Sequence, residues 1–478
     1  MKMKQNLISR RKLIDTGVKA GVALFLGPAV FPDLLAAPVQ RRYVPEFDVL
    51  KFGARGDGKT LDTRAIQAAI DRAARAGNGA RVIVRGGRRY LVGSLQLKSG
   101  IDFHLADDAE LVLSTARQHY GSNGVITASE AQGLRISGTG NIRGRALEFM
   151  DHYDEENEIW IAKEWRPKMF VLTACRDLEI CDISFSEAPE WGLHMIGCEH
   201  VLVDNLRVRN NLDVPNCDGI DPDHCRDVEI RNCHIVCGDD AIVVKATRQE
   251  KDYGPSDNIV VRDCVMETQD SGLKIGTETT QDIHHILFER CKIISSCRGL
   301  NIQLRDEGSV HDIVFRDITF TSRYHSAPWW GRGEAISLTA IPRTPQTKTG
   351  TIHDIAFHNI TGKSENSVRI NGSVESRICN VVMEDINLTI DRWTQYPGGV
   401  FDNRPTLVYQ PIEPHNTAGF SIRHADKVSL KNCSLEWGSN RPEYFTHAIE
   451  AEHVTGLSLT NFKGVSANPG TTEDVIIY

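Results

Sequence analysis

The chain has 478 residues, 41% of them hydrophobic and 25% charged, a composition typical of globular proteins rather than disordered or fibrous ones. Its formal net charge is -8, which argues against nucleic acid as a partner because phosphate binding needs a basic surface. No apolar run reaches the roughly 18 residues of a membrane span. At roughly 150 residues per domain, the length alone suggests about three domains.

The first 37 residues resemble an export signal. Ser9-Arg10-Arg11-Lys12-Leu13-Ile14 contains a twin-arginine pair, residues 20–32 are uncharged, and Leu35-Ala36-Ala37 offers small residues to a signal peptidase. The alternative is an ordinary basic tail. We expect residues 1–37 to be a twin-arginine signal peptide and the mature protein to be periplasmic or secreted. Removing the segment's six basic and two acidic side chains takes the net charge from -8 to -12.

A short helix is predicted near the start of the mature chain. Asp62-Thr63 forms a plausible N-cap, and apolar residues follow at helical spacing: Ala65, Ile66, Ala69, Ile70 and Ala73. We expect this helix to cap the exposed first turn of a repetitive fold.

From about residue 130 onward, one short phrase recurs. It reads polar residue, aliphatic, any residue, aliphatic, any residue, Asn or Asp, then Cys or an aliphatic, as in 177–183 and 227–233. The alternation predicts strands with one buried face. The first aliphatic residue falls at positions 178, 201, 228, 259, 286, 313, 355, 381, 428 and 457. Most copies are 23 to 31 residues apart with no helical pattern between them, which favours a β solenoid over a propeller with blades of about 40 to 45 residues. We therefore expect residues 38–478 to form one domain.

The 12 cysteines would suggest disulfides in an exported protein. Four of them, however, occupy the same position in four copies of the phrase: Cys233, Cys264, Cys291 and Cys433. We expect these four to stack as free thiols in the core, where Cys behaves as a small hydrophobe. The pairing of the other eight stays open.

A second phrase follows the strands: a variable residue, a small residue, then Ile or Leu. Equivalent positions on neighbouring coils lie about 4.8 Å apart, so the variable residues should form a line: Asp218, Asp240, Ser271, Arg298 and Glu334. Gly238 frees the backbone before Asp239, so Asp218, Asp239 and Asp240 should converge. Like charges this close raise one another's pKa, which lets one carboxyl act as an acid and another as a base on a glycosidic bond.

A metal site and a purely structural role are the alternatives to catalysis for these carboxylates. Clustered carboxylates also suit Ca²⁺, and Asp is common in turns, where it caps backbone groups. We expect the turn role for Asp223, Asp227 and Asp263.

The runs Asn216-Cys217-Asp218-Gly219-Ile220-Asp221 and Gly238-Asp239-Asp240 resemble glycoside hydrolase family 28, the polygalacturonases and their relatives. The similarity extends over roughly residues 47 to 465 and includes Phe52–Gly58, Tyr90–Leu95, Arg166-Pro167, Trp191, His194 and Cys198. The resemblance implies an all-β, right-handed parallel β-helix and hydrolysis with inversion. It also implies that Asp239 is the general acid while Asp218 and Asp240 position and activate water. No cofactor and no metal are expected.

The chain departs from the family where the substrate carboxylate is gripped. Asp270-Ser271-Gly272 stands where the family has Gly-His-Gly, and Asn301-Ile302-Gln303 where it has Arg-Ile-Lys. An amide cannot supply the missing charge. Lys274 should lie one coil from the vacated Arg position, and we expect it to replace the lost cations together with Arg298 or Arg305. The alternative is that Lys274 only solvates this face.

The remaining substrate-binding candidates are Asn216 and His194, the latter because Trp191 offers a sugar-stacking surface nearby. His224 is expected to be a hydrogen-bonded turn residue. The long inserts 144–170, 322–350 and 390–424 could wall off one end of the predicted cleft, which favours exo action.

The sequence thus predicts a monomeric, exported hydrolase of pectic poly- or oligosaccharide, cleaving α-linked galacturonic acid. One alternative is a uronate lyase or epimerase on the same fold, using Ca²⁺ or a strong base. The other is a glycan-binding solenoid without catalysis.

Overall fold

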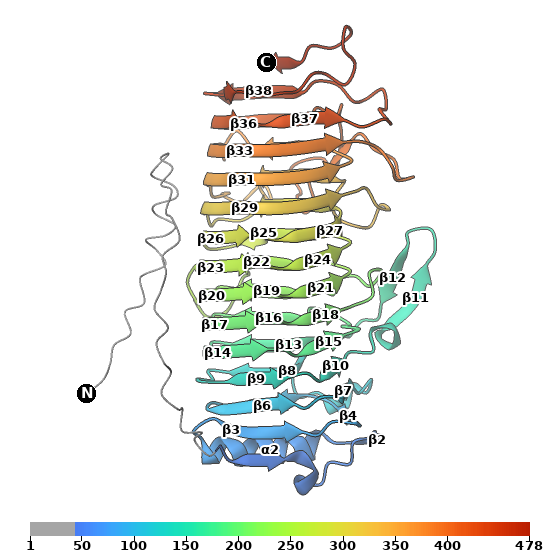
Figure 1. Ribbon diagram of the computed structural model, residues 1–478, viewed down its shortest axis with the longest axis vertical. Coiled ribbons are helices and arrows are strands. Elements are labelled where there is room, and N and C mark those ends of the chain that lie inside the picture. Colours follow the sequence, from blue (N-terminus) through green and yellow to red (C-terminus); the bar gives the residue numbers. More distant parts are fainter. Residues whose placement is uncertain (1–43) are drawn as a thin grey trace, which may run out of the picture.

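A computed structural model describes residues 44–478 and shows a column of stacked β coils (Figure 1). The predicted signal peptide lies outside the described residues. Thirty-six strands, from β1 to β40, join in one continuous sheet that winds around the long axis, and every pairing within it is parallel. The expected right-handed parallel β-helix is therefore confirmed.

Most coils contribute three strands, which stack on their equivalents to form three columns. Column A comprises β5 (Leu95–Gln96), β8 (Gly124–Ser129), β13 (Lys168–Thr173), β16 (Leu193–Ile196), β19 (Ile220–Asp223), β22 (Ile242–Ala246), β25 (Ser271–Thr279), β28 (Arg298–Leu304), β30 (Glu334–Ala340), β32 (Val368–Asn371), β36 (Phe420–Lys431), β38 (Ile449–Thr455) and β40 (Val475–Ile477).

Column B comprises β1 (Glu46–Asp48), β3 (Ala80–Val84), β6 (Ile101–Leu105), β9 (Arg135–Gly138), β14 (Arg176–Cys181), β17 (Glu199–Asp204), β20 (Arg226–Arg231), β23 (Ser256–Arg262), β26 (Ile283–Glu289), β29 (Val310–Ser322), β31 (Ile352–Ser364), β33 (Ile378–Ile390), the end of β36 and β39 (Ser458–Thr460). Column C comprises β2 (Asp57–Leu61), β4 (Arg88–Val92), β7 (Ala109–Leu113), β10 (Asn141–Arg143), β15 (Ser184–Ser186), β18 (Arg207–Arg209), β21 (His234–Cys237), β24 (Val265–Thr268), β27 (Lys292–Ser296), the ends of β29, β31 and β33, and β37 (Ser434–Trp437).

The recurring phrase corresponds to column B in register. Its first aliphatic residues are direct neighbours from coil to coil: Leu178, Val201, Val228, Ile259, Ile286, Ile313, Ile355, Val381 and Val428. These side chains point inward and are buried. Burial of this face fixes the register, because a slip by one residue would turn every apolar side chain outward.

The polar residues at both ends of the phrase have a backbone role. Asp227 and Asn232, which flank one copy, have φ of 56° and 55°, and the same left-handed conformation recurs at Asn258 and Asp263. Asn and Asp tolerate this conformation better than most residues. Asp263 lies in a bend directly after β23, as expected of a turn residue. Asp227 lies within β20 in a left-handed conformation and Asp223 is a fully buried residue of β19, so the turn expectation was wrong for these two.

All 12 cysteines are free thiols; eleven are buried and Cys379 is partly exposed. Cys233, Cys264, Cys291 and Cys433 are buried and unpaired, as predicted, and none of the 12 cysteines forms a disulfide. A second group of buried thiols, Cys175, Cys198 and Cys225, occupies successive coils.

The predicted helix is α2 (Thr63–Ala76), which buries Ile66, Ala69, Ile70 and Ala73 at the N-terminal end of the solenoid (Figure 1). Asp62 stands at the N-cap position, but its carboxylate does not cap the helix. It accepts hydrogen bonds from the backbone N–H groups of Arg55 and Gly56 instead, at 2.7 and 2.9 Å. Three short 3-10 helices also occur: η1 (Val49–Phe52), η2 (Arg117–His119) and η3 (Ala146–Phe149).

Two antiparallel hairpins interrupt the solenoid. β11 (Met150–Asp154) pairs with β12 (Ile159–Ala162) and projects from one side (Figure 1), and β34 (Val400–Asp402) pairs with β35 (Ile412–Pro414). Both belong to the predicted inserts. No helix within residues 44–478 is long and apolar enough to cross a membrane.

Candidate active site

The predicted line of variable residues is present along the start of column A. Ser271, Arg298 and Glu334 are direct register partners, and the pairing of Ile220 with Ile242 places Asp218 beside Asp240. The stacking of successive coils therefore brings together side chains that are 22 to 36 residues apart in sequence.

Asp218, Asp239 and Asp240, the carboxylate cluster, converge as predicted. One oxygen of each lies within 4.8 Å of one oxygen of each other member. Asp218 and Asp240 are almost fully buried, while Asp239 is partly exposed. Gly238 is needed for a reason other than backbone freedom, because a Cβ there would lie 2.2 Å from the Val214 carbonyl oxygen.

The carboxylate cluster holds protons at neutral pH. Burial, reinforced by the charges of Asp218 and Asp240, raises the pKa of Asp239 to about 8. Its carboxyl accepts hydrogen bonds from the backbone N–H groups of Asn216 (3.0 Å) and Asp240 (2.8 Å), which favour the ionised form but do not outweigh burial. Burial and the neighbouring Asp221 also raise the pKa of Asp218 well above its usual range.

Lys274 is bonded to the carboxylate cluster. Its Nζ donates to Asp240 Oδ2 at 2.7 Å, and it is the register partner of Asn301, as the repeat alignment predicted. Burial alone would lower the pKa of Lys274, but the carboxyls of Asp240 and Asp270 raise it above its ordinary value. Lys274 is therefore a permanent cation against Asp240.

A second buried lysine, Lys245, is a site residue that the sequence analysis missed. Its Nζ lies 3.7 Å from Asp218 Oδ2, 3.9 Å from Asp221 Oδ1 and 3.5 Å from Glu278 Oε2. Burial raises the pKa of Asp221 to about 7, although Lys245 opposes the rise. The sequence offered one signal for Lys245, the alternation of side chains along a strand. Val243 is the register neighbour of Lys274, and Lys245, two residues further on, points to the same face of β22.

Trp191 covers one flank of the lysines. Lys168 Nζ lies 3.6 Å and Lys245 Nζ 4.6 Å from the centre of its ring. His194 is buried behind Trp191, with Nε2 3.1 Å from Asp223 Oδ2 and Nδ1 3.3 Å from Lys168 Nζ. Burial lowers the pKa of His194 to about 4, so it is a neutral group held between partners.

Asn216 is exposed at the edge of the carboxylate cluster. It donates from its backbone to Asp239, and its side-chain oxygen accepts from Arg166 Nη2 at 3.0 Å. Arg166 also donates to the carbonyls of Pro189 and Pro215, so it fixes the loop that carries Asn216. His224 bonds the carbonyls of Gly254 and Thr247, which confirms its expected turn role.

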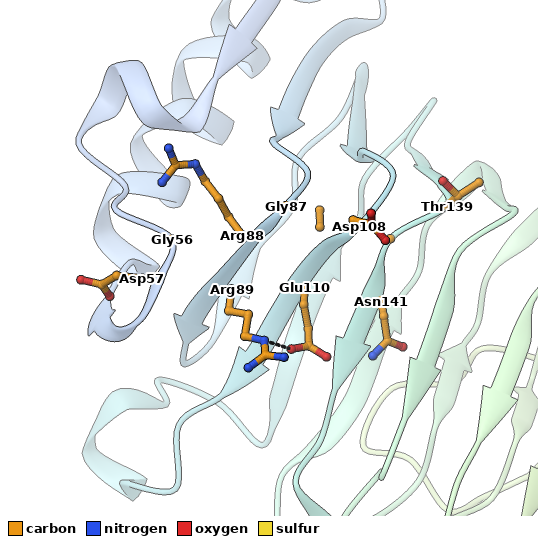
Figure 2. A pocket seen from close by; sticks show the side chains of 11 residues that line it. Gly56, Asp57, Gly87, Arg88, Arg89, Asp108, Glu110, Thr139 and Asn141 are labelled. Atoms are coloured by element: carbon orange, nitrogen blue, oxygen red, sulfur yellow. Dashed lines mark ion pairs between the residues drawn. The ribbon is translucent and has the colours of Figure 1, made fainter.

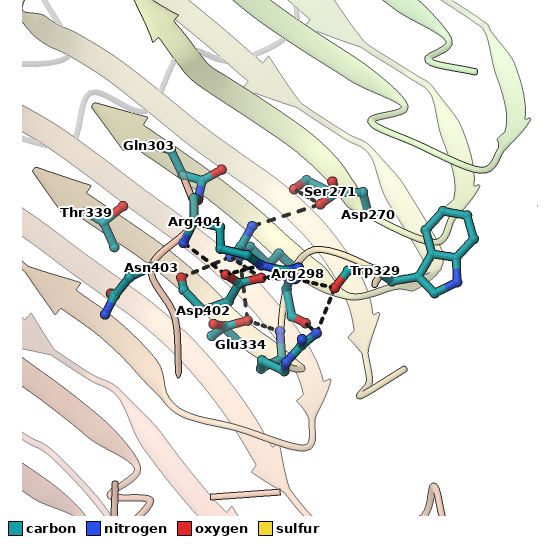
Figure 3. Close-up of polar contacts among 12 residues, drawn as sticks. Asp270, Ser271, Arg298, Gln303, Trp329, Glu334, Thr339, Asp402, Asn403 and Arg404 are labelled. Carbon is teal, nitrogen blue, oxygen red and sulfur yellow. Dashed lines mark hydrogen bonds and ion pairs between the residues drawn. The ribbon is translucent and has the colours of Figure 1, made fainter. Parts of the chain in front are cut away.

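Arg298 and Arg305 have no exposed surface. Figure 3 shows Arg298 among carboxylates, with Glu334 at 3.6 Å, Asp402 at 3.6 Å and Asp270 at 4.0 Å. Arg305 donates to Thr339 Oγ1 at 2.9 Å and to backbone carbonyls. The structure does not bring these two guanidinium groups to the surface beside Asp239.

The three predicted inserts meet one another beside the carboxylate cluster. Glu158, from the first, accepts hydrogen bonds at its backbone oxygen from Trp329 and at its carboxylate from Tyr396. The rings of His325 and Tyr396 stack with their centres 5.0 Å apart. His325 Nε2 in turn lies 3.1 Å from Gln269 Nε2, on the residue directly before Asp270. We call this group, Glu158, His325, Trp329 and Tyr396, the insert wall.

A separate pocket of about 630 Å³ lies among the first coils (Figure 2). It is lined by column C strands β2, β4, β7 and β10 and by the turns that precede them, and Arg89 and Glu110 form an ion pair of 3.2 Å within it. Asp57, Asp108 and Glu110 are among its lining residues, but among residues 44–478 no three of its acidic groups bring oxygens within 4.8 Å of one another, as the carboxylate cluster does.

The carboxylate cluster fits a metal ion poorly. Its oxygens are spaced for one, but Lys274 already neutralises Asp240 and Lys245 stands beside Asp218. A divalent cation there would face two ammonium groups across a few ångströms. The arrangement suits proton transfer between a neutral and a charged carboxyl.

Comparison with known proteins agrees with this geometry. Residues 82–396 match the family model described as "Glycosyl hydrolases family 28". A probable polygalacturonase of Vitis vinifera is 28% identical over 295 residues, covering 57% of this chain and 60% of the relative's length. An exopolygalacturonase of Zea mays is 24% identical over 361 residues, covering 72% and 83%.

Two solved structures share the fold. The family 28 exopolygalacturonase of Yersinia enterocolitica has a TM-score of 0.68 at 18% identity, covering 89% of this chain and 79% of its own. The exopolygalacturonase of Thermotoga maritima has a TM-score of 0.61 at 19% identity, covering 88% and 94%.

Proposed function

Since the chain belongs to the glycosyl hydrolases of family 28, we propose that it is an exported, monomeric enzyme that hydrolyses α-linked galacturonic acid in pectic poly- or oligosaccharides, with inversion and from a chain end. The observation that carries the proposal is the carboxylate cluster, in which a partly exposed, protonated Asp239 stands next to a lysine-bonded Asp240.

Each carboxyl has a role that follows from its surroundings. Asp239, protonated below about pH 8 and open to solvent, donates its proton to the leaving glycosidic oxygen. Asp240, paired with Lys274, is the charged group that accepts a proton from the attacking water. Asp218, whose pKa burial and Asp221 raise well above its usual range, positions that water by a hydrogen bond.

The spacing of the carboxyls makes the stereochemical outcome the sharpest test of this mechanism. Inverting enzymes commonly separate acid and base by about 6.5–9.5 Å, whereas retaining enzymes use about 5–5.5 Å. The oxygens of the carboxylate cluster lie within 4.8 Å of one another. We favour inversion because three carboxyls are present: Asp218 and Asp240 hold the water jointly, so no single acid and base need to span it.

Three lysines near the carboxylate cluster could bind the negatively charged carboxylate of a uronate substrate. Lys274 and Lys245 lie beside the carboxylate cluster, and the partly exposed Lys168 lies over Trp191. We propose that Lys274 and Lys168 attract the uronate while the Trp191 ring stacks on the sugar. Asn216 completes this binding surface from its exposed position, and His194 orients Lys168. Arg298 and Arg305 support the site from below through Asp270 and the Asp402 loop.

The insert wall supports attack from a chain end. Residues from three inserts are bonded to one another beside Asp270, so a polymer would meet a barrier after few sugar units. The names of the Zea mays and Yersinia enterocolitica proteins point the same way.

A uronate lyase or epimerase is the second candidate, because the fold does not decide the chemistry. It needs Ca²⁺ or a strong base near the C5 proton. The two lysines at the carboxylate cluster leave little room for Ca²⁺, which favours hydrolysis.

The test uses purified mature protein with polygalacturonate, oligogalacturonides and rhamnogalacturonan fragments. We expect saturated products, insensitivity to a chelator and, by proton NMR, a first product of inverted anomeric configuration. Asp239→Asn should lower kcat by about 10²–10⁴, with Asp227→Asn, at an exposed position of the column B strand β20, as the matched control. Activity surviving in Asp239→Asn would overturn the mechanism, and unsaturated, chelator-sensitive products would establish the lyase.

A further inference from the structure

Outside the active site, one cluster of metal-ligating side chains stands on column B. It lies on β23 and β26, which are neighbouring strands of successive coils (Figure 1). Asp257 on β23 is the register partner of His284 on β26, and with His285 they form a group whose ligand atoms lie within 4.8 Å of one another. His285 Nδ1 lies 2.8 Å and His284 Nδ1 3.1 Å from Asp257 Oδ1, and the two Nδ1 atoms are 2.7 Å apart. All three side chains are partly buried, at 12% exposed for Asp257, 16% for His284 and 28% for His285.

Hydrogen bonds alone cannot satisfy the three neighbouring atoms His284 Nδ1, His285 Nδ1 and Asp257 Oδ1. If both imidazoles carry a proton on Nδ1, two donors face each other at 2.7 Å. If only one does, the lone pair of the other Nδ1 faces a carboxylate oxygen, which is repulsive.

A cation satisfies all three atoms at once. At ligand distances of about 2.0–2.1 Å, neighbouring ligands of an octahedral ion stand about 2.9 Å apart and those of a tetrahedral ion about 3.4 Å apart. The observed separations of 2.7, 2.8 and 3.1 Å surround the octahedral value. Two imidazoles and one carboxylate on one face of an ion are a ligand set that first-row transition metals accept.

The local backbone and neighbours hold these ligands in place. His285 has φ of 53°, which turns its ring to the same side as that of the preceding His284. The His284 ring is stacked on His311 of the next coil, with centres 4.9 Å apart and planes 7° apart, and His311 is stacked on His353. This ladder fixes the His284 ring from the side away from Asp257.

We propose that Asp257, His284 and His285 bind a divalent first-row transition metal, with water in the remaining positions, as a clamp between adjacent coils. The site lies on column B, whereas the carboxylate cluster stands at the start of column A, so metal binding there does not require the catalytic carboxyls. A metal bound only by the folded chain stabilises it.

The test is isothermal titration of untagged protein with Ni²⁺ after chelator treatment. We expect one ion per chain and a rise in Tm on binding. His285→Asn removes a ligand while Asn tolerates the left-handed backbone, and Asp257→Asn removes the charge. Each should weaken Ni²⁺ binding at least tenfold and abolish the rise in Tm.

Two controls make the outcome decisive. His311→Ala removes the stacked neighbour but no ligand, so it should keep the stoichiometry of one, and Asp239→Asn should bind Ni²⁺ like the wild type. Circular dichroism without metal verifies that each variant is folded. Wild type that binds no Ni²⁺, binding unchanged in both His285→Asn and Asp257→Asn, or binding lost in Asp239→Asn would each overturn the proposal.

Discussion

At the scale of single residues, the site depends on how burial and charge divide protons among neighbouring carboxyls. The pKa values of Asp239 and Asp270 are each raised to about 8, and the pKa of Asp221 is raised to about 7. Because these groups interact, their protons are lost in steps that belong to the cluster rather than to one residue.

The pH dependence of catalysis follows from the raised pKa of Asp239. The acid is active only while protonated, so kcat should fall as pH rises through about 8. The measurement is kcat against pH on an oligogalacturonide, with substrate saturating at each pH. A plateau that continues to pH 10 would contradict the assignment of Asp239 as the acid.

Replacing Asp239 should stabilise the protein while removing activity. An unfolded Asp ionises near pH 4, whereas the folded Asp239 keeps its proton to about pH 8. Its contribution to stability is therefore present below pH 4 and is lost as pH rises towards 8. In Asp239→Asn this loss is absent, so the free energy of unfolding at pH 8 should increase by up to about 5 kcal/mol, less the part that solvent screens at this partly exposed carboxyl.

Thermal melts at pH 4 and pH 8 test this expectation. The gain in Tm of Asp239→Asn over wild type should appear at pH 8 and shrink at pH 4. Asp227→Asn, at an exposed position of β20, should stay within about 0.5 kcal/mol at both. An Asp239→Asn variant less stable than wild type at pH 8 would contradict the expected cost of ionising Asp239 in the folded protein.

Lys274 has two tasks that kinetics can separate. Its removal leaves Asp240 buried without its cation and takes a positive charge from the uronate site. We expect Lys274→Met to lower kcat and to raise KM for acidic oligosaccharides, each about tenfold or more. Lys168→Met, which lacks a contact with Asp240, should raise KM with kcat nearly unchanged. An unchanged KM in Lys274→Met would refute its role in binding the uronate.

Sequence reasoning found the three carboxyls and Lys274 because they belong to aligned phrases. It missed Lys245 and Asp221 because these residues become neighbours only when one coil is laid on the next. It also expected Arg298 and Arg305 to contact the substrate. Their positive charge and their place in column A do not reveal that the loop containing Asp402 folds over both side chains.

At the scale of elements, strand register was predictable and the inserts were not. The alternating apolar residues specified column B from Leu178 to Val428, because only one register buries that face. The recurring phrase does not cover the first coils, where left-handed glycines, Gly100 and Gly133, precede β6 and β9 in place of the Asn or Asp of the phrase. Contacts among inserts such as Glu158 with Tyr396 join segments 238 residues apart, and no periodicity encodes them.

The insert wall should control where the enzyme cuts. The double variant Glu158→Gln, Tyr396→Phe removes the charged hydrogen bond that joins two inserts while keeping both shapes. We expect polygalacturonate viscosity to fall at least several-fold faster per reducing end released, because chains could extend past the loosened wall. A variant at the exposed Ile161 of the same hairpin, Ile161→Ala, is the control. Identical viscosity curves for the double variant and wild type would reject the wall's role.

At the scale of the whole molecule, stability comes from stacking rather than from covalent links. The sheet is continuous from β1 to β40, and the 12 cysteines are free although export would place them where disulfides form. Burial explains how they stay reduced, because it raises the pKa of thiols such as Cys297, to about 12, and keeps them from forming reactive thiolates.

Reducing agent should therefore leave the protein unchanged. We expect equal Tm values with and without dithiothreitol, and 12 titratable thiols per chain after unfolding in guanidinium. A fall in Tm of several degrees, or fewer than 12 thiols, would reveal disulfides.

The constant spacing between coils also determines how a glycan bound along the solenoid would be positioned. Adjacent strands are about 4.8 Å apart, close to the length of one pyranose ring in a polysaccharide. A glycan lying parallel to the long axis would therefore advance by about one sugar for each coil, and column A would offer one binding position per coil. Asp218 and Asp240 stand at two successive positions of this kind. Adding or removing one coil would lengthen or shorten the bound glycan by one sugar and leave the chemistry where it is.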